Sequence, residues 1–272
     1  MENKRTYPAK GVLTALGKSL LYLLFFLVVQ FLAGIVYAAL AVAGGADAGS
    51  ILGGTETAVL LAYLLTAAAV LLWFRLRRVP LGEAAGLRRC SGWTAAFCAF
   101  GAIGLFVVVQ LALMLLPAAW LTDYNDHMEL LLSTGLIPAL SIAVAGPLAE
   151  ELMFRGVIQT RLERAMPVWA AVVLQAVLFG VTHGTPVQMA YAFLMGLVFG
   201  LLRSRTGSIL PGFAAHAAFN AMNDPLGLFS SAAGGWYALA VMAAVSTAGC
   251  VLCRRGLAPL AAPARQEGGS AL

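Results

Sequence analysis

Residues 146–155 read GPLAEELMFR, and this stretch decides how the rest of the chain is interpreted. It places the ionisable side chains of Glu150, Glu151 and Arg155 inside a segment that is otherwise as apolar as a membrane span. An ionisable side chain at membrane depth costs roughly 2.5–3.5 kcal/mol on insertion scales, so such residues normally face the protein interior and serve a function. The stretch therefore predicts a functional site inside a bundle of apolar helices.

The composition of the whole chain indicates an integral membrane protein. Of its 272 residues, 61% are hydrophobic and 11% are charged, and the mean hydropathy is +0.89. Soluble domains carry roughly 25% charged residues, so this chain lacks the polar surface that water requires. Its apolar runs exceed the ~20 residues that cross a bilayer as a helix, which satisfies its own backbone hydrogen bonds. The expected fold class is therefore all-α, a polytopic membrane helix bundle.

About eight transmembrane helices are expected, and they form one membrane domain in three parts. The parts are N-terminal helices (1–130), a central helical segment that carries the ionisable residues (131–225), and a last helix with a short disordered tail (226–272). The expected helices are 12–43, 57–75, 93–117, 134–164, 168–183, 187–202, 209–223 and 234–253.

The charge of the connections between the expected helices alternates along the chain and predicts the topology. Every second connection, together with both ends of the chain, is basic, and the connections between these are acidic or uncharged. The positive-inside rule therefore predicts that both termini are cytoplasmic. The composition is rich in Ala, Gly and Arg, which points to a bacterial plasma membrane. The Lys and Arg residues are scattered between apolar runs, and this distribution argues against nucleic acid as a partner. The basic residues are Lys4, Arg5, Lys10 and Lys18 at the start, then Arg75, Arg77, Arg78, Arg88 and Arg89, then Arg161 and Arg164, then Arg203 and Arg205, and finally Arg254, Arg255 and Arg265.

Glu150 and Glu151 are expected to play different parts. Glu151 and Arg155 are four residues apart and share a helix face, so Arg155 is expected to neutralise Glu151. Glu150 is rotated by about 100° from its neighbour and has no obvious local counter-ion. This makes Glu150 the candidate for accepting and returning a proton.

Two histidines can join Glu150. A turn expected near Pro167 lies midway between Glu150 and His183, so an antiparallel helix pair would bring the two residues to one level. Phe179 lies four residues before His183 and can pack beside its ring. His216 and Asn220 have the same spacing, so they share one face of a later helix.

Alternative explanations exist for each of these residues taken singly. A Glu-Glu-xxx-Arg pattern can be an intrahelical brace, and a histidine on an apolar face is often a core residue. His127, the third histidine, lies in an acidic segment and is expected to be solvated in a loop. The conjunction of one carboxylate, two imidazoles and an amide favours a site.

Together these residues resemble the CPBP intramembrane proteases, which include the type II CAAX prenyl endopeptidases and the bacterial Abi, or bacteriocin-immunity, proteins. The resemblance covers about residues 134–223 and includes the segment from Arg203 through Gly207 to Pro211. It implies that residues 131–225 form a catalytic helical core. The motifs are Glu-Glu-xxx-Arg at Glu150, Glu151 and Arg155, Phe-xxx-His at Phe179 and His183, and His-xxx-Asn at His216 and Asn220.

The resemblance implies an endopeptidase that acts on a peptide or membrane-protein substrate in the bilayer. Glu150, helped by His183, would activate water, and His216 and Asn220 would stabilise the oxyanion. Glu151, Arg155 and Phe179 would support the site. The competing account is a metalloprotease in which Glu150, His183 and His216 bind zinc. An oxyanion site is favoured over zinc because it also uses Asn220.

Two functions of other classes remain open from the sequence. One is a non-enzymatic, bacteriocin-immunity-like protein that binds a partner in the membrane. The other is an ion-coupled transporter, which would predict paired interrupted helices in related halves, and none is evident. Prenylation of the substrate is not carried over, because nothing in the sequence indicates a prenyl pocket.

Overall fold

The computed structural model describes residues 6–47, 49, 51, 54–78, 80, 82, 86–131, 135–223 and 235–261. Every regular element among these residues is a helix, which confirms the all-α fold class. The predicted tail and Asp224 lie outside the described residues.

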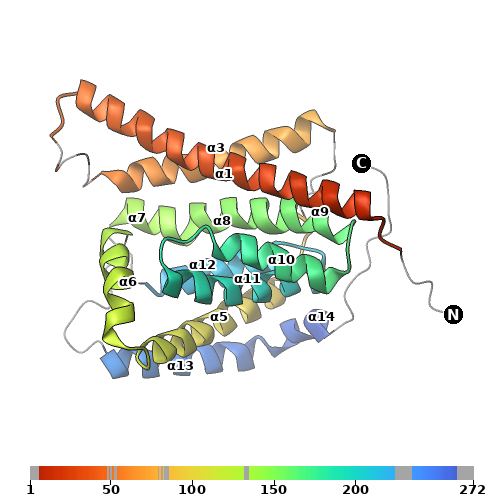
Figure 1. Cartoon of the computed structure of the whole chain (residues 1–272). Coiled ribbons are helices and arrows are strands. Elements are labelled where there is room, and N and C mark those ends of the chain that lie inside the picture. The colour runs from red at the N-terminus through yellow and green to blue at the C-terminus, as the bar shows by residue number, and fades with distance from the viewer. Residues whose placement is uncertain are drawn as a thin grey trace.

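The helices are arranged in layers (Figure 1). On one side α1 (Ala9–Ala43) crosses α3 (Thr55–Leu76), and on the other α5 (Gly92–Leu113) lies beside α13 (Gly235–Leu252). Between these layers lies a long helical stretch, with α10, α11 and α12 beside it. The bounds of these three are Val168–Gly180, Pro186–Thr206 and Leu210–Ala221.

In the described part of the chain, five helical stretches are long and apolar enough to cross a membrane. A sixth exists if Trp236–Leu252 and Arg254–Ala261 form one broken span, in which the two parts meet at 75°. The second part consists of the 3-10 turn η3 (Arg254–Leu257) and the short helix α14 (Ala258–Ala261). Helices α10 and α12 have only 13 and 12 residues, fewer than the ~20 that cross a bilayer alone. They pack against longer helices, so the polytopic bundle holds two short helices among its spans. The five stretches are Ala9–Ala43, Thr55–Leu76, Gly92–Leu113, Leu136–Glu163 and Pro186–Thr206.

The acidic segment expected to be a loop is instead helix α6 (Ala118–Leu131), so that expectation was wrong. Its charged side chains are exposed, whereas Tyr124 is buried and packs edge-to-face on Tyr191 with ring centroids 6.3 Å apart. Burial raises the pKa of the Tyr124 hydroxyl, which stays neutral at physiological pH. His127 is half-buried rather than solvated, and its ring occupies the space where Gly184 lacks a Cβ.

The long stretch Leu136–Glu163 is one continuous helical path, as predicted for 134–164, but it is not uniformly α-helical. π-Helical turns inside α-helices are frequently found at functional sites. Pro147 has no N–H to donate, which removes one helical hydrogen bond just after the first π segment. In order, its pieces are α7 (Leu136–Leu140), the π segment η1 (Ser141–Ala145), α8 (Gly146–Glu150), the π segment η2 (Glu151–Gln159) and α9 (Thr160–Glu163).

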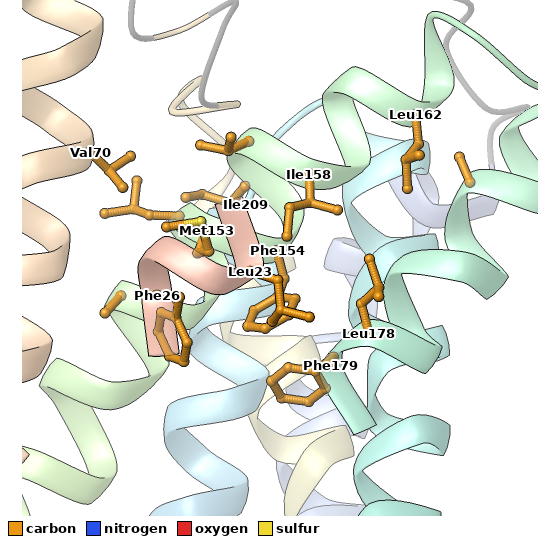
Figure 2. Packing of buried hydrophobic residues seen from close by; sticks show 14 of the residues in the cluster. Leu23, Phe26, Val70, Met153, Phe154, Ile158, Leu162, Leu178, Phe179 and Ile209 are labelled. Atoms are coloured by element: carbon orange, nitrogen blue, oxygen red, sulfur yellow. The ribbon is translucent and has the colours of Figure 1, made fainter. Parts of the chain in front are cut away.

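An apolar cluster holds this helical path in place (Figure 2). The fully buried ring of Phe154 contacts Phe26 of α1 and Phe179 of α10, with centroid distances of 5.7 and 5.1 Å. Aromatic pairs in such edge-to-face geometry add ~0.5–1.5 kcal/mol beyond the area they bury. The π segment that carries Glu151 is therefore fixed between α1 and α10.

Close packing of α10 on α11 depends on Gly196, where a Cβ would lie 2.9 Å from Cα and Cβ of Ala176. We expect Gly196→Ala to force these helices apart and to lower stability by ~1–3 kcal/mol, as overpacking does. Gly34→Ala is the matched control, because a Cβ there meets nothing within 4 Å. Thermal unfolding in detergent checks both variants, and equal melting temperatures would contradict the close approach.

Candidate active site

The predicted residues come from α8, η2, the turn after α10, and α12, which lie next to one another in the bundle (Figure 1). Glu151 and Arg155 form the expected ion pair, with Arg155 Nη1 2.9 Å from Glu151 Oε1. Both side chains are fully buried. A buried charge is stable only when it is paired, so this ion pair holds η2 in the core.

Aromatic rings complete the environment of Arg155. Its guanidinium carbon lies 4.3 Å from the ring centroid of Phe179 and 5.1 Å from that of Phe199. Apart from this ion pair, the guanidinium nitrogens of Arg155 have no polar partner among the described residues, so its stabilisation comes from Glu151 and from the faces of these rings.

His216 links the two carboxylates. Its Nδ1 lies 3.3 Å from Glu151 Oε1, and its Nε2 lies 3.5 Å from Glu150 Oε2. The imidazole also stacks on Phe199 with ring centroids 4.8 Å apart. The ring plane of His216 is therefore set by Phe199, and the direction of its two nitrogens by the carboxylates.

Glu150 is placed differently from its neighbour. Its side chain is 13% exposed, whereas that of Glu151 is 0% exposed. Its Oε1 accepts a hydrogen bond of 3.1 Å from the Tyr63 hydroxyl of α3. Tyr63 in turn lies against Gly146, where a Cβ would approach the ring to 3.1 Å. Glu150 is thus oriented from outside the motif helices and, unlike Glu151, keeps part of its side chain exposed.

His183 lies in the turn after α10 and is half-buried. Its Nδ1 lies 2.9 Å from the Phe179 carbonyl oxygen, and its ring packs edge-to-face on Phe179 at 4.9 Å. Because a carbonyl only accepts, Nδ1 must carry the proton, which leaves Nε2 as an acceptor in the neutral ring. Phe179 also packs edge-to-face on His216 with ring centroids 5.8 Å apart, so one aromatic ring contacts both histidines, whereas the approach of His183 to Glu150 stays a prediction.

Asn220 is half-buried one turn after His216 and donates from Nδ2 to the Ile142 carbonyl oxygen at 3.0 Å. Ile142 belongs to the first π segment. The amide nitrogen has a second N–H, which this hydrogen bond does not use. Asn220 therefore ties α12 to η1 and keeps one donor.

Gly212, in the first turn of α12, allows this helix to approach the buried carboxylate. A Cβ at this position would lie 2.7 Å from Glu151 Oε2. That oxygen has no hydrogen-bond partner among the residues that the structure describes. The glycine thus provides the space in which Glu151 faces His216.

A polar network beside the site was not predicted as a unit. Arg203 donates to Glu163 Oε2 at 2.8 Å and to the Thr160 hydroxyl at 2.7 Å. Ser204 donates to Glu163 Oε1 at 2.7 Å, and Gln159 donates to Ser204 Oγ at 2.9 Å. The network links α11 to the carboxyl end of η2 and to α9. In the sequence, only the family-like segment that begins at Arg203 indicated this region.

The zinc alternative concerns Glu150, His183 and His216. Over the described ranges, no group of three or more His, Cys, Asp or Glu side chains is placed to hold a metal ion. No chemical step is assigned to a metal at these residues.

Comparison with known proteins gives one family. Residues 132–222 match the family model described as Type II CAAX prenyl endopeptidase Rce1-like. No curated protein and no solved structure matched the chain. The matched segment contains all three motifs, and it supports CAAX-type intramembrane protease activity in general, which implies a peptide substrate and a membrane environment. Residues 132–222 are thus similar to the type II CAAX prenyl endopeptidases, and together with the long apolar helices this similarity supports an integral membrane protein with a segment of the CPBP intramembrane protease type.

Proposed function

We propose that the protein is an intramembrane endopeptidase in which Glu150 activates the attacking water. The observation that carries this proposal is the contrast between two adjacent carboxylates. Glu151 is fully buried and paired with Arg155, whereas Glu150 is partly open and lies beside His216. An accessible, oriented carboxylate in a largely apolar site is suited to take a proton from water and return it.

In the proposed reaction, water lies between Glu150 and His183. Glu150 takes one proton from this water, and the unprotonated Nε2 of His183 accepts a hydrogen bond from the other O–H, which orients the oxygen toward the substrate carbonyl carbon. The hydroxide oxygen bonds to this carbon and the carbonyl becomes a tetrahedral oxyanion. Glu150 then passes its proton to the substrate nitrogen as the C–N bond breaks.

The proposed oxyanion donors are His216 and Asn220. The contact between His216 Nε2 and Glu150 is long, at 3.5 Å, and it weakens further when Glu150 becomes neutral on taking a proton. In the doubly protonated ring of His216, Nδ1–H faces Glu151 and Nε2–H is then available to the oxyanion, together with the second N–H of Asn220. Donors fixed in advance by Glu151, Phe199 and Ile142 lower the cost of reorganisation in the transition state.

Tyr63 is proposed as a positioning residue for Glu150. Tyr63→Phe removes the only O–H that reaches Glu150 among the described residues. A hydrogen bond to a charged group contributes about 1.5–3 kcal/mol, so we expect kcat to fall roughly tenfold or more with little change in KM. Tyr237→Phe, on an exposed side chain of α13, is the matched control. An unchanged kcat for Tyr63→Phe would contradict the positioning role.

The orientation in the membrane follows from charge. The start of α1 and the ends of α9 and α14 lie at the same end of the bundle (Figure 1), and basic residues gather at these helix ends. The positive-inside rule places this end in the cytoplasm of a bacterial cell, with both termini there. Protection of terminal tags in sealed inverted vesicles, or their digestion, distinguishes this topology from its opposite.

The function is tested with purified protein reconstituted in vesicles that contain a library of membrane peptides. The protease reading predicts new peptide termini by mass spectrometry, at a rate that a strong chelator leaves unchanged. Loss of cleavage with the chelator would support zinc instead. Absence of cleavage by the wild-type protein would favour the immunity-like binding protein.

A further inference from the structure

A cavity of about 410 Å³ lies on the far side of η2 from the candidate active site, between α1 and α3. Its volume falls within the ~300–1,000 Å³ typical of small-molecule sites. Phe25, Val70 and Trp73 form part of its walls, and Met153 and Val157 of η2 form its floor. This surface is apolar and adjoins the lipid-facing side of α1, where Leu21 is 63% exposed.

One end of this cavity is basic. A second hollow, of about 30 Å³, shares Tyr22, Trp73 and Val157 with the first and continues to Arg161 and Arg164. Because the two hollows share these three lining residues, they adjoin each other and together make one groove. We call it the α1–α3 groove.

The two arginines keep their charge available to the groove. Arg161 lies within 3.5 Å of the Tyr22 hydroxyl, and Arg164 is exposed. Glu163, which lies between the two arginines in the sequence, is instead bound by Arg203 at 2.8 Å and by Ser204 at 2.7 Å. The end of the groove is therefore a site of positive charge.

The position of this end suits a lipid headgroup. Tyr22 and Trp73 pack edge-to-face at 5.9 Å where the apolar walls meet the arginines. Tyr and Trp favour the membrane–water interface, and basic pockets between helices on the cytoplasmic side bind anionic headgroups. The end of α9 lies at the basic end of the bundle (Figure 1).

We propose that the α1–α3 groove binds one anionic phospholipid, with an acyl chain in the apolar part and the phosphate at Arg161 and Arg164. Charge complementarity selects an anionic lipid over a zwitterionic one, and the elongated apolar part selects a lipid over free phosphate. The bound chain packs against Met153 and Val157 and so supports η2 from the side opposite Arg155.

Native mass spectrometry tests this with phosphatidylglycerol and phosphatidylcholine of equal chain length. Near the membrane surface each arginine contributes about 1 kcal/mol toward an anionic lipid, so the wild-type protein should prefer phosphatidylglycerol at least roughly tenfold. Arg161→Gln with Arg164→Gln should abolish the preference. Arg254→Gln with Arg255→Gln, which removes two exposed charges from η3, should retain it. Inorganic phosphate should not displace the bound lipid.

A second variant tests the apolar part without a change of charge. Ala69→Trp fills the groove and should weaken retention of both lipids, with a melting temperature measured to confirm folding. Equal retention of the two lipids by the wild-type protein, or an unchanged preference without Arg161 and Arg164, would overturn the proposal. Neither readout depends on protease activity, so this inference can fail while the proposed function stands.

Discussion

Replacing Glu150 with glutamine is expected to reduce peptide cleavage by ~10²–10⁴-fold, which is the usual contribution of a general base. Glutamine has nearly the same shape and still accepts a hydrogen bond from Tyr63, but it does not take a proton from water. The loss should therefore appear in kcat, with KM and melting temperature nearly unchanged. Cleavage rates of a single peptide by reconstituted protein provide the measurement.

The matched control for this prediction is Glu129→Gln. Glu129 is exposed on α6, and the same chemical change there should leave the cleavage rate unaltered. If Glu150→Gln retains wild-type activity while folded, Glu150 is not the base.

Replacing Arg155 with methionine is expected to have the largest effect on stability. The substitution keeps an elongated side chain but leaves the buried carboxylate of Glu151 without its guanidinium partner. Breaking a buried ion pair from one side typically costs 3–5 kcal/mol, which corresponds to a fall of roughly 6–20 °C in melting temperature for a chain of this size. The cation–π contacts with Phe179 and Phe199 are lost as well.

Two further variants separate the charge effect from general packing. Arg155→Met combined with Glu151→Gln removes the unpaired charge and should recover much of the lost stability. Arg254→Gln, at an exposed position, should stay within ~0.5 kcal/mol of the wild-type protein. A melting temperature for Arg155→Met as high as that of Arg254→Gln would contradict a structural role for the pair.

Residue spacing was enough to predict much of the site. An interval of four predicted the ion pair between Glu151 and Arg155, and the same interval predicted that Phe179 packs beside the ring of His183. These two predictions succeed because helical periodicity is local. The approach of Glu150 to His183 across the turn at Pro167 stays a prediction.

The parts that were not predicted depend on long-range contacts or on small changes of register. Tyr63 and Phe199 reach the site from helices that carry no motif, although a tyrosine hydroxyl in an apolar span signals a need for a partner. The π segments change the helical register without a change in composition. Helix α6 was missed because hydrophobicity indicates membrane spans, whereas this helix is amphipathic and packs through Tyr124.

In the proposed mechanism Glu150 acts as the base, whereas its neighbour Glu151 stabilises the fold through Arg155. Cleavage rate and melting temperature, measured side by side for Glu150→Gln and Glu151→Gln in reconstituted protein, separate these two roles. We expect Glu150→Gln to lose cleavage and keep its melting temperature, whereas Glu151→Gln should lower the melting temperature by removing the partner of Arg155. Wild-type cleavage by Glu150→Gln, or an unchanged melting temperature for Glu151→Gln, would contradict these roles.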